Sequence, residues 1–309
     1  MAALKPTRIL ISSALLLLTG CGPSAATTAA TTNTHLSGPY LGQAPPGNLS
    51  QPFAPSIIPI SGLHTPPVFS PDNEEAYWKD SRFDTISMMK LENGIWTAPF
   101  QISLSAKLSD FRDPCLSPDG NKLFFISKSA LPFQSAAREN IWVAERSAGG
   151  WLEPRPLNKA VNAHNLHWQV SAAANGNLYF ASFDSGIQDI YCAEFADGEY
   201  RNPIKLGKGI NLENTAEWSP CVSPDETMLL FTRGRAVDGS SDYPSIFVSF
   251  KDSEGNWGEA KQLIRLGYNV LCPQLSPDKK FLFFLGPGAG GEGGRTYWVS
   301  ADILEELLP

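Results

Sequence analysis

The chain has 309 residues, of which 42% are hydrophobic and 18% are charged, and its formal net charge is −7. This balance excludes a disordered polymer and a protein with many membrane spans, and the negative charge disfavours nucleic acid as a partner. The 26 Gly, 25 Pro, 8 Trp and 17 Phe residues disfavour a helical bundle and favour short, aromatic-rich strands joined by tight turns.

The first 20 residues have the features of an export signal. Two basic residues precede an apolar run at residues 9–18, which is too short to cross a bilayer. The run ends at Leu18-Thr19-Gly20-Cys21. This motif resembles the bacterial lipoprotein signal, which implies that residues 1–20 are removed and that Cys21 carries the lipid. The alternative is an ordinary secretory signal in which the cysteine is incidental.

The resemblance implies that the mature chain is anchored in the bacterial cell envelope by its lipid. Gly22 follows the cysteine, and this makes the outer membrane the default location, facing either the periplasm or the cell surface. We expect residues 21–51 to form the lipidated cysteine and a flexible tether, because residues 22–37 are almost uncharged and rich in Ala, Thr, Ser and Pro. Tyr40 and Leu41 could pack on the domain that follows, over residues 52–309.

A turn motif recurs through this domain. Phe69-Ser70-Pro71-Asp72 returns about every 50 residues, as Leu116-Ser117-Pro118-Asp119, Val222-Ser223-Pro224-Asp225 and Leu275-Ser276-Pro277-Asp278. We place a degenerate third copy at Val170-Ser171, where Ala172 and Ala173 replace Pro and Asp. Because Pro presets φ for a type I turn and Asp can bond back to the local backbone, we expect the recurring Asp residues to be structural.

Each copy is followed by the same order of features. In the second copy these are an aromatic strand at Leu123-Phe124-Phe125, a polar loop, a third strand at Ile141-Trp142-Val143, and a fourth strand that opens at Gly150-Trp151. Four short strands per unit are typical of a β-propeller blade.

The two ends of the domain determine the number of blades. The fifth copy stops after its third strand, at residues 296–300, whereas residues 52–58 precede the first copy and match the fourth strands, such as residues 98–102. We therefore predict an all-β fold, a five-bladed β-propeller of four-stranded antiparallel blades. The N-terminal strand completes the last blade and closes the ring.

The chain also resembles a known group of propellers. The Ser-Pro-Asp turns, Asp189-Ile190-Tyr191, Tyr297-Trp298-Val299 and the leading Tyr40-Leu41-Gly42-Gln43 resemble the Pro-Asp type of WD-like repeat found in TolB-like bacterial envelope proteins. The resemblance covers residues 40–309 and implies the fold and an envelope location. Function must still be argued from a site, because one propeller scaffold hosts many unrelated activities.

The inner strand of each blade begins at the face that carries the loops between blades, here called the loop face. The opposite face carries the tight Ser-Pro-Asp turns and is called the turn face. We expect long loops at residues 127–139 and 232–244, so the loop face is the expected binding surface. The residues that enter the inner strands there form the candidate binding set: Arg112, Asp113, His167, Trp168, Glu217 and Trp218.

Two functions are open for this set, beside a purely structural envelope role. The favoured one is a protein- or peptide-binding or scaffolding module, in which Asp113 and Glu217 bond to neighbouring backbone. The alternative is a glycoside hydrolase-like enzyme or a glycan-binding propeller, in which Asp113 and Glu217 form a carboxylate pair and Trp168 and Trp218 stack on a sugar. We favour the first because a third inner carboxylate is missing, and we expect a monomer that touches the membrane through its lipid alone.

Metal, cofactor and disulfide signals are weak. His164-x-x-His167 has no acid or third His nearby in the sequence, so we predict no metal site, and no cofactor motif occurs. Besides Cys21, the chain contains Cys115, Cys192, Cys221 and Cys272. We expect buried free thiols, because Cys115 and Cys221 occupy the same position in blades that are not adjacent; Cys221 with Cys272 is the one pair to test.

Overall fold

The computed structural model describes residues 36–58, 65–80, 82–235, 244–263, 266–267, 269–287 and 294–308, without the side chains of His167 and Arg235. The chain divides into two units, Met1–Thr34 and His35–Pro309, and all described residues belong to the second. The expected signal peptide and the lipidation site Cys21 therefore lie outside the described residues.

The Ser-Pro-Asp turns join the first two strands of a blade through a fixed set of side-chain hydrogen bonds. The Ser117 hydroxyl donates to Asp119 Oδ1 (2.5 Å) and accepts from the Lys122 amide (2.9 Å), and Asp119 also accepts from the Asn121 amide (3.0 Å). The same three bonds occur in the turns that begin at Ser70, Ser223 and Ser276. Each of these Asp side chains thus fixes its own turn, as the motif predicts.

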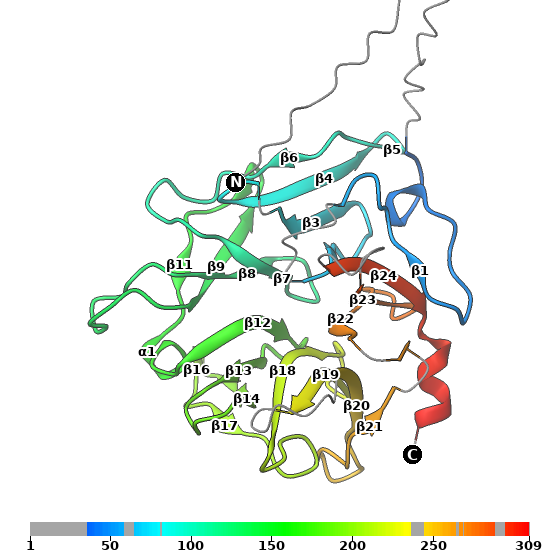
Figure 1. Ribbon diagram of the computed structural model, residues 1–309. Coiled ribbons are helices and arrows are strands. Elements are labelled where there is room, and N and C mark those ends of the chain that lie inside the picture. The colour runs from blue at the N-terminus through cyan, green and yellow to red at the C-terminus, as the bar shows by residue number, and fades with distance from the viewer. Residues whose placement is uncertain are drawn as a thin grey trace, which may run out of the picture. The chain divides into compact units, whose positions relative to one another are not determined.

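The strands form five antiparallel blades, numbered one to five in chain order (Figure 1). From the axis outward, the first blade contains β2 (Val68–Phe69), β3 (Glu75–Lys79), β4 (Ile86–Glu92) and β6 (Phe100–Gln101), and the second contains β7 (Arg112–Leu116), β8 (Lys122–Ser127), β9 (Asn140–Ser147) and β11 (Arg155–Pro156). The third blade contains β12 (Leu166–Ala172), β13 (Leu178–Ser182), β14 (Asp189–Ala193) and β17 (Ile204–Lys205). The fourth contains β18 (Thr215–Val222), β19 (Met228–Arg235), β20 (Ser245–Phe250) and β21 (Lys261–Gln262).

The fifth blade contains β22 (Leu271–Leu275), β23 (Phe281–Pro287) and β24 (Gly294–Ser300), and it is completed by β1 (Gln51–Pro52) from the N-terminal side of the domain. Gln51 pairs with Trp298 and Pro52 with Tyr297, and the Phe53 amide donates to the Thr296 carbonyl (2.9 Å). In Figure 1 the blue β1 lies beside the red β24. The predicted five-bladed, all-β propeller closed by an N-terminal strand is confirmed.

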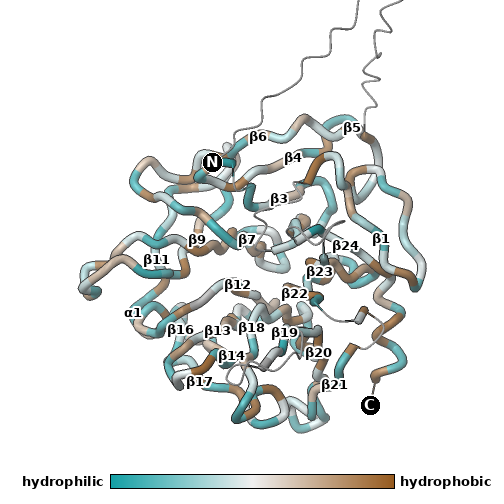
Figure 2. The backbone as a smooth tube through the Cα atoms, viewed as in Figure 1, coloured by the Kyte–Doolittle hydropathy of each residue, from teal (hydrophilic) through white to brown (hydrophobic). Residues whose placement is uncertain are grey.

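An aromatic cluster fastens this closure. Trp298 is fully buried, and its ring centroid lies 5.1 Å from that of Phe53, 5.6 Å from Phe283 and 5.9 Å from Tyr40. Tyr40 belongs to the short 3₁₀ turn η1 (Tyr40–Gly42), and it is buried together with Leu41. The segment before β1 therefore packs against the first and last blades, and Figure 2 shows hydrophobic residues recurring along the strands around it.

The remaining elements lie at the edges of the blades. Short hairpins follow the third strands and involve β5 (Ile95–Trp96), β10 (Gly150–Trp151), β15 (Phe195–Ala196) and β16 (Glu199–Tyr200). The helical turns α1 (Lys159–Asn162) and η3 (Ala301–Leu307) follow β11 and β24. The aromatic residues after the Gly turns thus lie in or beside these hairpins, and the outer strands of the first four blades begin a few residues later than expected.

The third repeat is the one place where the predicted alignment is wrong. The Ser171 hydroxyl accepts from the Val222 amide of the next blade, just as the Cys221 sulfur accepts from the Leu275 amide. Ser171 therefore occupies the position of Cys221, and Ala173 occupies the position of the turn serine. The third turn is also one residue shorter, because Ala173 bonds to Asn177 whereas Ser117 bonds to Lys122.

Candidate functional site

Four inner strands carry an irregularity at the same height. The pairing register shifts between the first and second strand within β7, β12, β18 and β22. One residue in each shift has a positive φ, namely Asp113 (46°), Trp168 (56°), Ser219 (51°) and Cys272 (56°). We call these four the bulge residues. Bulges re-aim side chains, and they are enriched next to functional sites.

The bulge residues approach one another around the axis. The Ser219 hydroxyl lies 3.3 Å from the Cys272 sulfur of the adjacent blade. The charge of Asp113 also acts on the Cys272 thiol, whose pKa is raised to about 12 chiefly by burial. The carboxyl group of Asp113, the hydroxyl of Ser219 and the thiol of Cys272 therefore lie near one another at this height.

Asp113 is the most unusual of the predicted site residues. Its side chain is 0% exposed, and neither carboxylate oxygen has a hydrogen-bond partner among the residues that the structure describes. Burial is the largest cause that raises the pKa of Asp113 to about 7, the charge of Glu139 adds to it, and Arg112 partly opposes it. The protein-binding interpretation expected Asp113 to bond to neighbouring backbone. That expectation is wrong, because neither oxygen of Asp113 has such a partner.

The cations beside Asp113 have other partners. Arg112 donates through Nε to Asp110 Oδ1 (2.6 Å), and its Nη1 lies 3.9 Å from Glu139 Oε1. Lys79 donates through Nζ to the Phe83 carbonyl (2.6 Å). Neither side chain reaches the Asp113 carboxylate with a hydrogen bond, so its charge is not neutralised by a direct contact.

Glu217 lies in a different environment, on β18. Its Oε1 accepts from Arg233 Nε (2.8 Å) and from the Thr215 hydroxyl, whereas Oε2 has no partner within the described parts of the chain. Burial raises the pKa of Glu217 although Thr215 and Arg233 act in the opposite direction. The Arg233 guanidinium also lies 4.4 Å from the ring centroid of Phe247. Glu217 is thus half of a closed, buried ion pair.

Trp168 and Trp218 form an edge-to-face pair with centroids 6.5 Å apart and planes at 67°. Both are partly exposed. The Trp168 amide donates to Glu139 Oε2 (3.0 Å), and a Cβ atom at Gly234 would lie 2.9 Å from Trp218 Cη2. Glu139 thus holds the backbone of Trp168, and the ring of Trp218 packs against Gly234. Both tryptophans are positioned by specific contacts.

The structure brings only part of the predicted set together. The tryptophans meet, and Arg112 adjoins Asp113, but the acid that acts on Asp113 is Glu139 and the acid that acts on Glu217 is Asp189. His167 lies in β12, with its side chain outside the description. Glu139 and Arg233 were missed by sequence reasoning; the available signal was that each directly borders a long second-to-third-strand loop.

The overall fold has solved counterparts. TolB from Acinetobacter baumannii superimposes with a TM-score of 0.51 at 16% identity over 78% of this chain and 52% of that chain. The putative TolB from Agrobacterium tumefaciens superimposes with a TM-score of 0.55 at 17% identity over 78% of each chain. The fold is that of a TolB-like propeller. The chain spans about half the length of the A. baumannii protein, and no protein family and no curated protein matches its sequence.

Metal and thiol chemistry find little support in this TolB-like propeller. Within the described residues, no three His, Cys, Asp or Glu side chains are grouped so that they could hold a metal ion. His164 pairs through Nδ1 with Asp184. Cys115, Cys192, Cys221 and Cys272 are all free; Cys192 is half-buried and the other three are buried, close to expectation.

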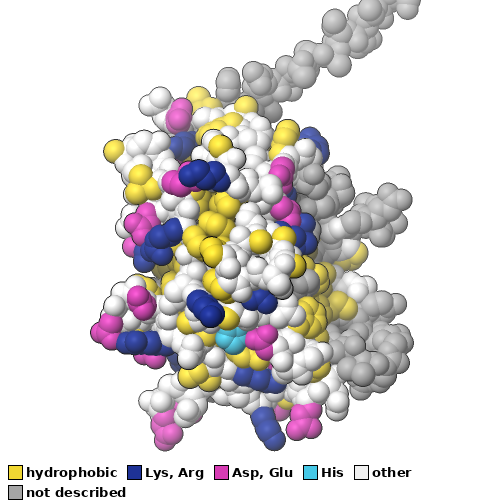
Figure 3. Space-filling view, turned by 90° about the vertical axis from the view of Figure 1, so that its left-hand side faces the viewer, with side chains coloured by type: hydrophobic (Ala, Val, Ile, Leu, Met, Phe, Trp, Pro, Cys, Tyr) yellow, Lys and Arg dark blue, Asp and Glu magenta, His cyan; other side chains and the backbone are white. Residues whose placement is uncertain are grey.

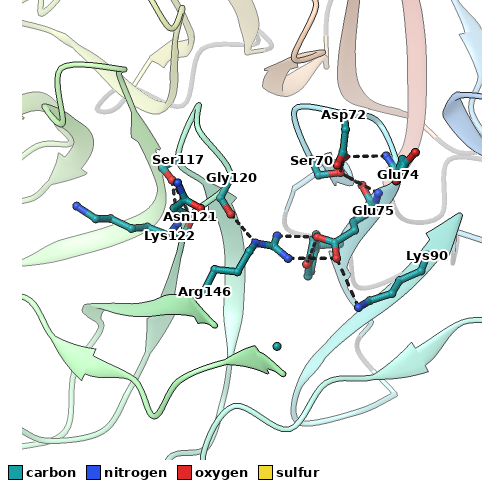
Figure 4. Close-up of polar contacts among 12 residues, drawn as sticks. Ser70, Asp72, Glu74, Glu75, Lys90, Ser117, Gly120, Asn121, Lys122 and Arg146 are labelled. Atoms are coloured by element: carbon teal, nitrogen blue, oxygen red, sulfur yellow. Dashed lines mark hydrogen bonds and ion pairs between the residues drawn. The ribbon is translucent and has the colours of Figure 1, made fainter. Parts of the chain in front are cut away.

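The turn face of the propeller is braced by contacts between blades. Arg146 of the second blade binds Glu75 of the first at 2.6 Å and donates to the Gly120 carbonyl at 2.7 Å (Figure 4). Lys279 of the fifth blade binds Asp225 of the fourth at 2.8 Å. A cavity of about 160 Å³, lined by residues of all five blades, opens on the axis here. Its lining mixes Pro and aliphatic residues with Ser117, Ser171, Ser276, Gln274 and Asp278.

Among the described residues, no helix is long and apolar enough to span a membrane. Figure 3 shows the side formed by the second and third blades, where hydrophobic side chains lie among charges of both signs. Ile204 of β17 is 71% exposed, and it is the most exposed large hydrophobic residue of these two blades among those described. This side offers positions for control substitutions away from the axis.

Proposed function

We propose that this TolB-like propeller is a lipid-anchored module of the bacterial envelope that binds a protein or peptide at its loop-face mouth. The observation that supports it best is the grouping of the partly exposed Trp168, Trp218 and Arg112 around the bulge residues. Trp and Arg are enriched among residues that dominate binding energy. A propeller also presents loops from all of its blades around one mouth.

Replacement of Trp218 by Ala is expected to weaken partner capture about tenfold or more, because a partly exposed indole at the centre of an interface contributes about 2 kcal/mol or more. The measurement is quantitative capture from cross-linked envelope extracts with the wild-type chain and this variant. Arg112→Ala is expected to act in the same direction.

Ile204→Ala is the matched control, because Ile204 is exposed on an outer strand. It should capture the same partners as the wild-type chain. Equal capture by all the variants, or repeated failure of the wild-type chain to retain any protein, would refute the proposed function.

The glycan alternative is less well supported. A retaining glycosidase needs two carboxyl groups about 5 Å apart and an inverting enzyme needs about 6.5–9.5 Å. Asp113 is influenced by Glu139, whereas Glu217 is occupied by Arg233. Turnover of a polysaccharide that is abolished by Glu217→Gln would nevertheless establish this function in place of protein binding.

The envelope location rests on the signal motif of residues 1–21, and its test is a single substitution. Cys21→Ser is expected to abolish lipid attachment, because the thiol that carries the lipid is gone. Metabolic labelling with a radioactive fatty acid should mark the wild-type chain and not the variant. Equal labelling of both chains, or of neither, would contradict the lipid anchor.

A further inference from the structure

Among the described residues, three inner strands carry buried hydrogen-bond acceptors that have no partner. On the inner strands β7, β12 and β18, the buried side-chain atoms without a partner are all acceptors: Asp113 Oδ1, Asp113 Oδ2, Gln169 Oε1 and Glu217 Oε2. A buried acceptor without a donor costs free energy, and a buried unpaired carboxylate costs more. The missing group is therefore a donor, and at Asp113 it is one that also carries positive charge.

The resident charged groups do not supply this donor. Around Asp113 the charges are Glu139, Asp110, Arg112 and Lys79. The two cations already bind Asp110 and the Phe83 carbonyl. Across the axis stand the Ser219 hydroxyl and the Cys272 thiol, which contact each other and are neutral. Among the described residues, no cation thus donates a hydrogen bond to the carboxyl group of Asp113.

The aromatic groups of the next two blades suit a cation, and the Trp168 amide binds Glu139, the acid whose charge acts on Asp113. Trp168 is the bulge residue of the blade next to Asp113, and it forms the edge-to-face pair with Trp218. Indole faces attract ammonium and guanidinium groups, most strongly where water is excluded. A lysine or arginine side chain could pack its apolar stem against the outer face of such a ring and place its charged end toward a carboxylate.

We propose that the loop-face mouth recognises a lysine or arginine side chain of the bound protein or peptide, and that Asp113 is its counter-ion. This inference rests on the proposed function and adds the chemistry of the partner. The pair formed by Trp168 and Trp218 packs against the stem, and Gln169 Oε1 accepts a further N–H. No covalent step is involved; the Asp113 carboxyl group loses its proton to solvent when the cation binds.

The test is selection of a random library of short peptides on the immobilised full chain. The expected result is enrichment of Lys or Arg at one position. In the best binder, replacement of that residue by norleucine should weaken binding to the wild-type chain about tenfold or more. Against the Asp113→Asn variant the same replacement should have almost no effect, because the counter-ion is gone.

Asp80→Asn is the matched control. Asp80 is also buried, but it is paired with Arg82 at 2.5 Å, so this variant should keep the full Lys or Arg dependence. Calorimetry in buffers of different ionisation enthalpy should show proton release on binding of the peptide to the wild-type chain near neutral pH, and none for Asp113→Asn.

Each other outcome decides against this inference. Enriched peptides without a cation that still require Trp218 would refute it while leaving the proposed function intact. Failure to enrich any peptide would also refute it, and the capture experiment then tests the proposed function separately. If Ca²⁺ from CaCl2 alone bound in a way that depends on Asp113, the carboxyl group would be assigned to an inorganic cation. The proposal that it binds a Lys or Arg side chain of a peptide would then be refuted.

Discussion

Replacing Asp113 with Asn is expected to stabilise the free protein, by up to about 4 kcal/mol at about pH 8. The pKa of this carboxyl group is about 7 in the folded chain and 3.8 in its usual range, so folding favours its protonated form. Ionisation of Asp113 therefore lowers the unfolding free energy of the wild-type chain. This loss is absent below about pH 4, grows between about pH 4 and 7, and is complete above that range. Asn removes the charge and tolerates the positive φ of 46°.

The measurement is chemical denaturation of both chains at about pH 4 and about pH 8. The gain should be present at the higher pH and nearly absent at the lower one. Asp80→Asn should have the opposite sign at the higher pH, because the hydrogen bonds from Arg82 lower the pKa of Asp80. If Asp113→Asn destabilised the chain more at about pH 8 than at about pH 4, the carboxylate would have a stabilising partner and the cation site would lose its basis.

Replacing Phe53 with Ala is expected to cost about 3–5 kcal/mol of unfolding free energy. Phe53 is 1% exposed and follows directly after β1. Its ring lies 5.0 Å from Phe283 and 5.1 Å from Trp298, between centroids. Removing the ring would leave a cavity at the junction of the first and last blades, where the ring of blades is closed only by short strands.

Phe100→Ala is the matched control, because Phe100 lies in β6, the outer strand of the first blade, and is 39% exposed. Its cost should stay below about 1 kcal/mol, as for most surface substitutions. Denaturant unfolding of both variants compares the two sites. Equal small costs would mean that the N-terminal segment does not close the propeller.

The fold could be predicted because its information is local and repeated. The Ser-Pro-Asp turns specify the hairpin between the first two strands, and the incomplete fifth repeat requires a strand from elsewhere. The third blade shows where this reasoning stops. Ser171 resembled a turn serine in sequence, but it takes the place of Cys221 and bonds across to Val222. That bond joins different blades, so no local pattern reports it.

The sequence predicted the strands that carry the candidate residues and not the pairing of their side chains. Trp168, Trp218, Arg112 and Asp113 do lie on the inner strands β12, β18 and β7. The bulges that give Asp113 and Trp168 a positive φ have no clear sequence signature, since neither residue is glycine. The approach of Glu139 to Asp113 joins the end of the loop before β9 with β7 of the same blade. Such pairings depend on register and loop path, which composition does not encode.

Site-specific photo-cross-linking in intact cells tests most directly whether a protein partner binds at the loop face. A photoreactive residue would replace Leu212, which is 40% exposed in the loop leading into β18, or Ala174, which is exposed in the third turn of the turn face. We predict a discrete cross-linked protein product from position 212 that disappears when Trp218→Ala is added, and no such product from position 174. Products from position 174 alone, or from neither position, would contradict the account.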